Sequence, residues 1–132
     1  MILSGWETLR ETRLGGVTVH GGGIRELHWH PNTDEWQFFI SGTGKMTVFA
    51  TGGRARTMDF QAGDVGYIQK TLPHYVQNTG DTDLKFLEMF KSSFYQDLAL
   101  SEGLTHTPPE LAMVHLGLTG PRSTPCLRTR LW

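Results

Sequence analysis

Cysteine is nearly absent from this chain of 132 residues, in which Cys126 stands alone. A single cysteine cannot form an intrachain disulfide, so stability must come from packing or from a bound metal, and we expect Cys126 to be an incidental thiol. Long apolar runs are absent too, since none approaches the roughly 20 residues that a membrane-spanning helix needs. The first residues also lack the basic and apolar regions of a signal peptide. The sequence therefore predicts no membrane span and leaves the cellular compartment undetermined.

Neither sign of charge dominates the chain. It has 12 basic and 13 acidic residues, and no block of either sign. Nucleic acids and anionic membranes attract proteins with strongly basic surfaces. We therefore expect neither of them to be a partner.

Glycine is abundant, with 16 residues, and short alternating stretches are separated by glycine, proline, asparagine and aspartate. This pattern is typical of antiparallel strands joined by turns. The expected strands cover residues 17–20, 24–30, 35–40, 45–50, 55–60, 65–69, 75–78 and 84–90. Strands of this number and length favour a closed barrel, because closure removes exposed edges. The sequence thus predicts an all-β protein.

The chain length suits one domain with one core. We expect an N-terminal extension over residues 1–16 and a barrel over residues 17–91. A C-terminal segment, residues 92–116, should contain a short helix that begins at the Pro108–Pro109 pair, because proline is tolerated in the first turn. Residues 117–132 have no pattern and are expected to form a tail.

The strand at residues 35–40 alternates between two sets of side chains. We expect Trp36, Phe38 and Ile40 to pack the barrel. Gln37 and Phe39 share the opposite face with Glu35, the first residue of the strand, and are expected to line a cavity.

Three histidines and one glutamate suggest a metal site. His28 and His30 are two residues apart, so in a strand their imidazoles point to the same face. Glu35 begins the next strand after a proline turn, and His74 begins a later strand after a Leu-Pro turn. A barrel could bring all four side chains to one ion and leave positions open for a substrate or dioxygen.

The ligand types alone leave the metal open. Imidazole suits iron, copper, zinc, nickel and cobalt, whereas carboxylate and water suit manganese. The other histidines fit no such pattern and are expected to be surface or hydrogen-bonded residues: His20, His106 and His115.

The spacing of these residues resembles the first motif of the cupin family. The residues that carry the resemblance are Gly22, His28, His30, Glu35 and Gly42. The resemblance implies a single cupin, which is a double-stranded β-helix or jelly-roll barrel, with a short C-terminal helical segment.

The second cupin motif is matched by Gly63, His74 and Asn78. Gln69 stands where the family usually has proline, and Thr71 where it usually has glycine. Both changes fall in the turn before His74, so the geometry of this turn is expected to differ from the family pattern.

A longer stretch, residues 25–37, is similar to the manganese-dependent oxalate decarboxylases, and segments 46–50, 61–67 and 86–91 extend the similarity. It runs over about residues 17–116 and is most like the second cupin of those two-cupin proteins. It implies an Mn(II) site that binds oxalate and, with dioxygen, releases carbon dioxide and formate.

By position in this resemblance, Arg25 would bind or polarise oxalate and Glu88 would donate a proton. Glu88 shares its strand face with Leu84, Phe86 and Phe90, and burial among such residues raises the pKa of a carboxyl group. Strict alternation places Arg25 opposite to the metal-ligand face, so a β-bulge near the glycine run would be needed to turn it inward.

Two departures bear on function. The decarboxylases carry a mobile Ser-Glu-Asn-Ser lid after the last strand of their first cupin, and residues 92–97 of this chain lack that run. The N-terminus is also shorter by about a strand, and a partner chain could supply the missing edge, so we expect a homo-oligomer.

Three functions therefore remain open. The first is an enzyme that decarboxylates oxalate or a similar small dicarboxylate. The second is a module that binds a metal or a small acid without turnover. The third is a dioxygen-dependent oxidation, as in an oxalate oxidase or an iron cupin.

Overall fold

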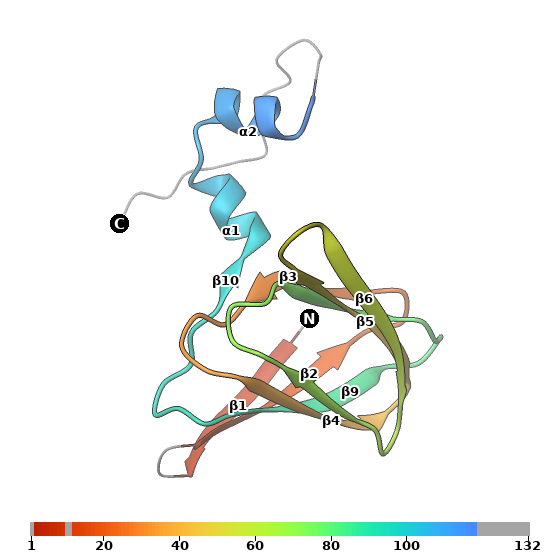
Figure 1. Cartoon of the computed structure of the whole chain (residues 1–132). Coiled ribbons are helices and arrows are strands. Elements are labelled where there is room, and N and C mark those ends of the chain that lie inside the picture. The colour runs from red at the N-terminus through yellow and green to blue at the C-terminus, as the bar shows by residue number, and fades with distance from the viewer. Residues whose placement is uncertain (1, 10–11, 119–132) are drawn as a thin grey trace.

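The protein is a two-layered β-barrel with a small helical segment beyond one end (Figure 1). The computed structural model describes residues 2–9 and 12–118, with side chains from residue 12 onward. Two five-stranded sheets face each other, and every strand pairs antiparallel with its neighbours. The expected all-β jelly-roll barrel is confirmed.

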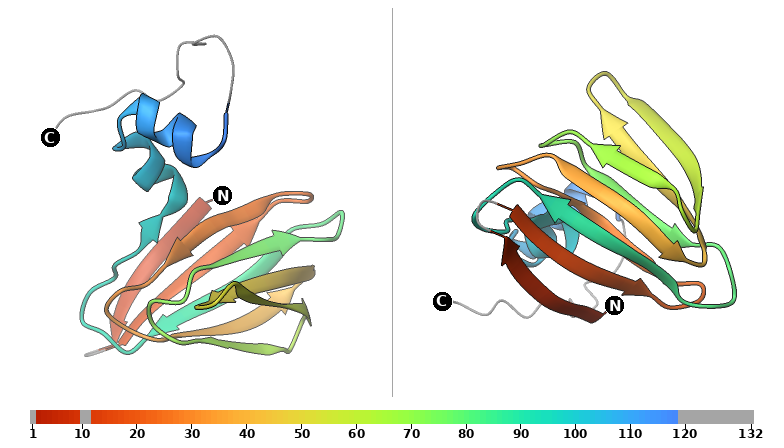
Figure 2. Two further views of the ribbon diagram at one scale, coloured as in Figure 1. Left: turned by 45° about the horizontal axis from the view of Figure 1, so that its top comes forward. Right: turned by 90° about the horizontal axis from the view of Figure 1, so that it is seen from below.

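The first sheet has the strand order β1-β2-β9-β4-β7. Its strands are β1 (Ile2–Leu9), β2 (Thr12–Val19), β9 (Leu84–Phe90), β4 (Glu35–Ser41) and β7 (Val65–Ile68). The second sheet has the order β10-β3-β8-β5-β6. Its strands are β10 (Leu98–Ala99), β3 (Ile24–Trp29), β8 (His74–Asn78), β5 (Thr43–Ala50) and β6 (Arg54–Gln61). Figure 2 shows the two sheets as curved layers that enclose the barrel interior.

The hydrophobic core fills one part of this interior. Alternate residues of each strand point inward, and each large apolar side chain buried there contributes about 1.5–3 kcal/mol. The core residues are Val17, Val19, Phe39, Met46, Phe60, Ile68, Val76, Leu84 and Phe86.

Strand β4 shows one prediction that is right and one that is wrong. Gln37 and Phe39 are fully buried, as expected. Trp36, Phe38 and Ile40 are 49%, 39% and 49% exposed, so they do not pack the barrel interior. Alternation separates two faces of a strand without telling which one is inside, and here both faces are largely apolar.

The N-terminal residues also differ from expectation. Residues 1–16 were expected to lie outside the barrel, with a first strand at 17–20, but β2 begins at Thr12 and β1 pairs with it. Gly15 and Gly16 lie in β2 and carry no side chains, which hides its alternation. Strand β2 also pairs with β9, so β1 and β2 extend this side of the sheet within the chain itself.

Two short helices follow the barrel. α1 (Leu100–Thr105) was not predicted, because a six-residue helix shows little periodicity, whereas α2 (Pro109–His115) begins at the expected proline. Neither of the helices described is long and apolar enough to cross a bilayer. Most of the expected tail, with Cys126, lies outside the described residues.

The turn before β8 contains an unusual backbone conformation. Thr71 has φ = 70°, in the left-handed region that favours glycine, and its backbone N–H donates to the carbonyl of His30 at 2.8 Å. A β-branched residue in this region is strained by roughly 1–2 kcal/mol. This is the position where the second cupin motif usually has glycine, so the departure has a direct structural cost.

We expect Thr71→Gly to raise the free energy of unfolding by about 1 kcal/mol, because relief of strain exceeds the added entropy of the unfolded chain. Chemical denaturation measures this change. Thr82→Gly is the matched control, since Thr82 is exposed and lies outside the left-handed region, and it should be destabilising. A loss of stability in Thr71→Gly would contradict the strain.

Candidate metal centre

Three strands bring the predicted ligands together. His28 lies in β3, His30 follows the end of β3, Glu35 begins β4 and His74 begins β8. β3 and β8 are paired, with His28 directly opposite His74. The turn after β3 then leads the chain into the other sheet, where Glu35 faces the same interior.

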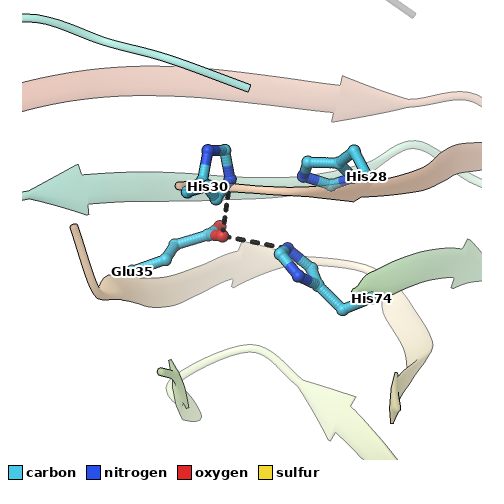
Figure 3. Close-up of side chains that lie close together, drawn as sticks. All are labelled: His28, His30, Glu35 and His74. Carbon is cyan, nitrogen blue, oxygen red and sulfur yellow. Dashed lines mark ion pairs between the residues drawn. The ribbon is translucent and has the colours of Figure 1, made fainter. Parts of the chain in front are cut away.

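All four side chains are buried and converge on one place (Figure 3). One ligand atom of each lies within 4.8 Å of the ligand atoms of the others. Glu35 Oε2 is 3.0 Å from His30 Nε2 and 3.0 Å from His74 Nε2. The structure therefore brings together the complete set predicted from spacing.

The backbone fixes the proton on each imidazole. Nδ1 of His28 lies 2.7 Å from the carbonyl of Glu26, and Nδ1 of His74 lies 3.0 Å from that of Leu72. Nδ1 of His30 lies 2.8 Å from the carbonyl of Gln96. Because a carbonyl only accepts, each Nδ1 must donate, which leaves Nε2 of the neutral ring as a lone-pair donor to a metal.

The convergence of these lone pairs fits a cation. All three Nε2 atoms and Glu35 Oε2 are buried without a hydrogen-bond partner in the described chain. Such acceptors repel one another unless a cation lies between them. Adjacent ligands of an octahedral ion with bonds near 2.1 Å lie about 3 Å apart, which matches the two 3.0 Å separations.

The protonation states suit metal binding. Burial, together with the neighbouring His74 and Arg25, lowers the pKa of His28 to about 3, so its ring is neutral near pH 7. Burial alone would raise the pKa of Glu35, but the imidazoles of His30 and His74 beside it outweigh burial and keep the pKa below its usual value. Gln37 Nε2 donates to Glu35 Oε1 at 2.7 Å and orients the carboxylate.

Arg25 is buried in β3, with 3% of its surface exposed. The pairing of β3 with β8 is irregular between Arg25 and His28, where three steps along β3 match two along β8. This bulge cancels the alternation, so both side chains are buried. A bulge was expected nearer the glycine run, and it instead lies inside the strand.

Arg25 is held by two residues that follow the barrel. Its Nη2 donates to Asp97 Oδ2 at 2.6 Å and to the Tyr95 hydroxyl at 3.0 Å, and that hydroxyl donates to Asp97 at 2.8 Å. Burial works to lower the pKa of Arg25, but Glu88 and Asp97 outweigh it and raise the pKa. The sequence did not indicate Asp97, since it lies in a segment without periodicity. One signal could have indicated Asp97: a buried arginine needs an acidic partner, and Asp97 could supply that charge.

Glu88 lies in β9, fully buried and opposite Gln37 of β4. Neither of its carboxyl oxygens has a hydrogen-bond partner among the residues described. Burial and the charge of Glu35 raise its pKa well above the usual value, although Arg25 acts in the opposite direction. A carboxyl group with a raised pKa holds its proton to higher pH, which suits a general acid.

The whole arrangement agrees with a known family. Residues 5–122 match the cupin family. The chain belongs to the cupins. Within this cupin, the first motif supplies three of the four converging side chains and the second supplies His74.

The relatives of this cupin are oxalate decarboxylases. It is 54% identical to oxalate decarboxylase OxdC of Bacillus subtilis over 102 aligned residues. The aligned region covers 77% of this chain and 26% of the relative. A solved structure of the B. subtilis enzyme, from work on its Mn(II) centres, superposes with a TM-score of 0.80 at 50% identity, covering 83% of this chain and 29% of that one. A formate complex of the Lactobacillus farciminis oxalate decarboxylase superposes with a TM-score of 0.79 at 43% identity, covering 83% of this chain and 32% of that one.

The chain thus spans about a quarter of the length of the curated relatives that it matches. The family match over residues 5–122 includes all four converging side chains.

Proposed function

We propose that this cupin is a metal-dependent enzyme that decarboxylates oxalate, or a similar small dicarboxylate, to formate and carbon dioxide. The observation that carries the proposal is the convergence of three Nε2 atoms and one carboxylate oxygen inside a barrel that also buries Arg25 and Glu88. The similarity to oxalate decarboxylases supports the choice of substrate.

His28, His30, Glu35 and His74 would hold the metal, and we propose Mn(II), as in the centres described for the B. subtilis enzyme. The same set of three nitrogens and one oxygen also accepts iron, zinc, nickel, copper or cobalt. When bound, the ion supplies a Lewis acid, open coordination positions and access to redox chemistry.

Arg25 provides the recognition of a carboxylate. Its guanidinium is cationic and buried, and its Nε lacks a hydrogen-bond partner within the described part of the chain. A planar guanidinium can bind a carboxylate through two parallel hydrogen bonds. Arg25 would therefore orient one end of oxalate while the other end faces the four ligands.

Glu88 provides the proton. In the net reaction the carbon–carbon bond of oxalate breaks, one carboxylate leaves as carbon dioxide, and a proton joins the remaining carbon to give formate. The protonated carboxyl of Glu88 supplies that proton and is reprotonated from water. The net reaction consumes no dioxygen, and we propose that dioxygen is required without being consumed, as the resemblance to oxalate decarboxylases implies.

One observation favours binding without turnover as a second candidate. Segment 92–97 lacks the acidic run of the decarboxylase lid, and its residues are tied to the site through Arg25 and His30. A segment held in this way delivers no additional acid from a lid.

The test is a metal analysis of the purified chain, followed by assays for formate and hydrogen peroxide with oxalate, with and without dioxygen. Formate with carbon dioxide supports the decarboxylase. Peroxide would show an oxidase, and stoichiometric metal with neither product would show a binding module.

We expect Asp97→Asn to raise KM for oxalate about tenfold, equivalent to about 1.4 kcal/mol, with a smaller change in kcat. The loss of the charged partner frees Arg25 from its fixed position. Steady-state kinetics at saturating metal measure both constants. Asp59→Asn is the matched control, because the Asp59 side chain is 84% exposed and its Oδ1 makes a long, exposed ion pair of 3.7 Å with Lys45 Nζ. Equal KM values in the two variants would contradict the role of Asp97.

A further inference from the structure

The hairpin of β5 and β6 extends past the level of the metal ligands. Val48 lies opposite His74, the first residue of β8, and β5 continues from there to Ala50 before residues 51–53 turn the chain into β6. Figure 1 shows this hairpin at the end of the barrel from which β10 departs. The side chains on the inner face of the hairpin therefore border the way into the barrel at the metal end.

A row of inner side chains leads from this hairpin to the metal centre. Arg56 of β6 lies opposite Val48 of β5, which lies opposite His74, and His74 lies opposite His28. Neighbouring strands are about 4.8 Å apart, so about 10 Å separates the backbone of Arg56 from that of His74. Arg56 is exposed, Val48 is partly buried and His74 is fully buried. Burial thus increases along the row towards the metal ligands.

A groove of about 750 Å³ lies at the hairpin end of this row. One wall comes from β5 and β6, and the other from β7. Because β6 and β7 are edge strands of the two sheets, the groove occupies the opening between the sheets. We call it the arginine groove, and its lining includes Val48, Ala50, Arg54, Arg56, Met58 and Tyr67.

The arginine groove is positively charged. Among the described residues that line it, Arg54 and Arg56 carry positive charge and none carries negative charge. Both arginines are exposed, and they share one face of β6 because they are two residues apart. Nε of Arg54 donates to the Thr51 carbonyl at 3.2 Å, and neither guanidinium forms an ion pair within the described part of the chain. Their charges are therefore available to an anion from solvent.

The acidic residues closest to the groove do not cancel this charge. Asp34 accepts hydrogen bonds from the Tyr67 hydroxyl at 2.9 Å and from the backbone N–H of Lys70 at 2.8 Å. Asp59, on the outer face of β6, lies 3.7 Å from Lys45. Each of these acids has a basic residue beside it, so the two arginines set the sign of the net charge around the groove.

Another side of the barrel mouth is covered by residues 91–97. Asn32 Nδ2 donates to the Ser92 hydroxyl at 3.1 Å. His30 Nδ1 lies 2.8 Å from the Gln96 carbonyl, to which it donates. These hydrogen bonds hold the segment against the metal ligands, which leaves the arginine groove as the more open approach to them.

We propose that the arginine groove is the entrance through which a small dicarboxylate reaches the metal ligands, with Arg54 and Arg56 attracting the dianion and Val48 as the last side chain before His74. Charges around a cleft raise the association rate of an oppositely charged ligand. The two arginines act on the ligand in transit, whereas Arg25 holds it once bound. The dicarboxylate is taken from the proposed function, but the entrance serves binding with or without turnover.

The rate of oxalate binding tests the role of charge. Co(II) in the metal site gives a visible absorption that changes when a ligand coordinates, and stopped-flow mixing without dioxygen follows this change. In Arg54→Gln/Arg56→Gln, we expect the association rate of oxalate to fall about tenfold at an ionic strength of about 0.01 M. The loss should shrink to less than about twofold at 1 M, where charges are screened within about 3 Å. The dissociation rate should stay unchanged.

Two controls separate charge from structure. Lys45→Gln/Lys85→Gln removes the same net charge from exposed positions outside the groove and should bind oxalate at nearly the wild-type rate. Uncharged triazole should bind the wild-type chain and the arginine variant at equal rates. Metal analysis and circular dichroism confirm that each variant is loaded and folded.

A blocking substitution tests the route itself. Ala50 is exposed and lines the groove, so Ala50→Trp should slow both oxalate and triazole at least about threefold, because a tryptophan ring fills much of the opening. Gln77→Trp is the matched control, since Gln77 is exposed on the outer face of β8, and it should bind both ligands normally.

Each contrary result overturns the proposal. An unchanged oxalate rate in the arginine variant, or a loss that persists at 1 M, would exclude attraction by these charges. Equal slowing of triazole in that variant would show a change of structure instead, and normal rates in Ala50→Trp would place the entrance elsewhere. A formate assay keeps the proposed function separate. Formate production without an arginine effect would remove only the entrance, and an arginine effect without formate would remove only the decarboxylase.

Discussion

His28→Ala should bind Mn(II) at least about 100-fold more weakly than the wild-type chain, since loss of a ligand exceeds the 10- to 100-fold cost of losing an outer-shell contact. His28 is fully buried, and its Nε2 has no hydrogen-bond partner among the described residues, which leaves it available to the proposed ion. Metal analysis and titration of the metal-free protein measure the loss. A wild-type metal content in this variant would contradict the ligand set.

Thermal unfolding gives a second measurement of the same change. A ligand present at 100 times its Kd stabilises the folded state by about 2.7 kcal/mol. Mn(II) should therefore raise the Tm of the wild-type chain and have little effect on His28→Ala. His115→Ala is the matched control, since this histidine is exposed on α2, and it should respond to Mn(II) as the wild-type chain does.

Glu88→Gln should keep its metal and lose decarboxylation, with kcat reduced at least about 100-fold, the lower range of general acid catalysis. Glutamine preserves the shape of the side chain and removes the acidic proton. Product analysis with metal quantification measures both properties. Glu102→Gln, on the exposed surface of α1, is the control and should be unaffected; an unchanged kcat in Glu88→Gln would exclude Glu88 as the acid.

The same variant should alter the dependence of stability on pH. The raised pKa of Glu88 means that the folded state binds its proton more tightly than the unfolded state does. This contribution is fully present below the unfolded pKa of about 4.3 and is lost as the pH rises through the raised folded pKa. The stability of Glu88→Gln relative to the wild-type chain should therefore increase with pH above about 4.3.

Local pattern was sufficient to predict the converging set. Each member stands at or next to a strand end marked by a turn, and His28 and His30 are separated by the strand period. The burial of Gln37 and Phe39 followed from the same parity. These features depend on neighbours in the chain, which is why a sequence reveals them.

Features that depend on contacts between distant segments were not predicted. The choice of the inner face of β4 depends on what packs against it, so the exposure of Trp36 was missed. Asp97 reaches Arg25 across 72 positions of the chain. Strand β2 was only partly recognised because its two glycines carry no side chains, and its pairing with β9 defines it instead.

The extra residue in β3 uncouples the face that a side chain occupies from its count along the chain. Three positions separate Arg25 from His28, yet both side chains are buried, because three steps along β3 match two along β8. Deletion of one residue between them would restore regular pairing and leave the arginine two positions before His28, which is again the inner face. Related barrels could therefore keep an inward arginine at either spacing, and a comparison of spacings alone would miss that these arginines are equivalent.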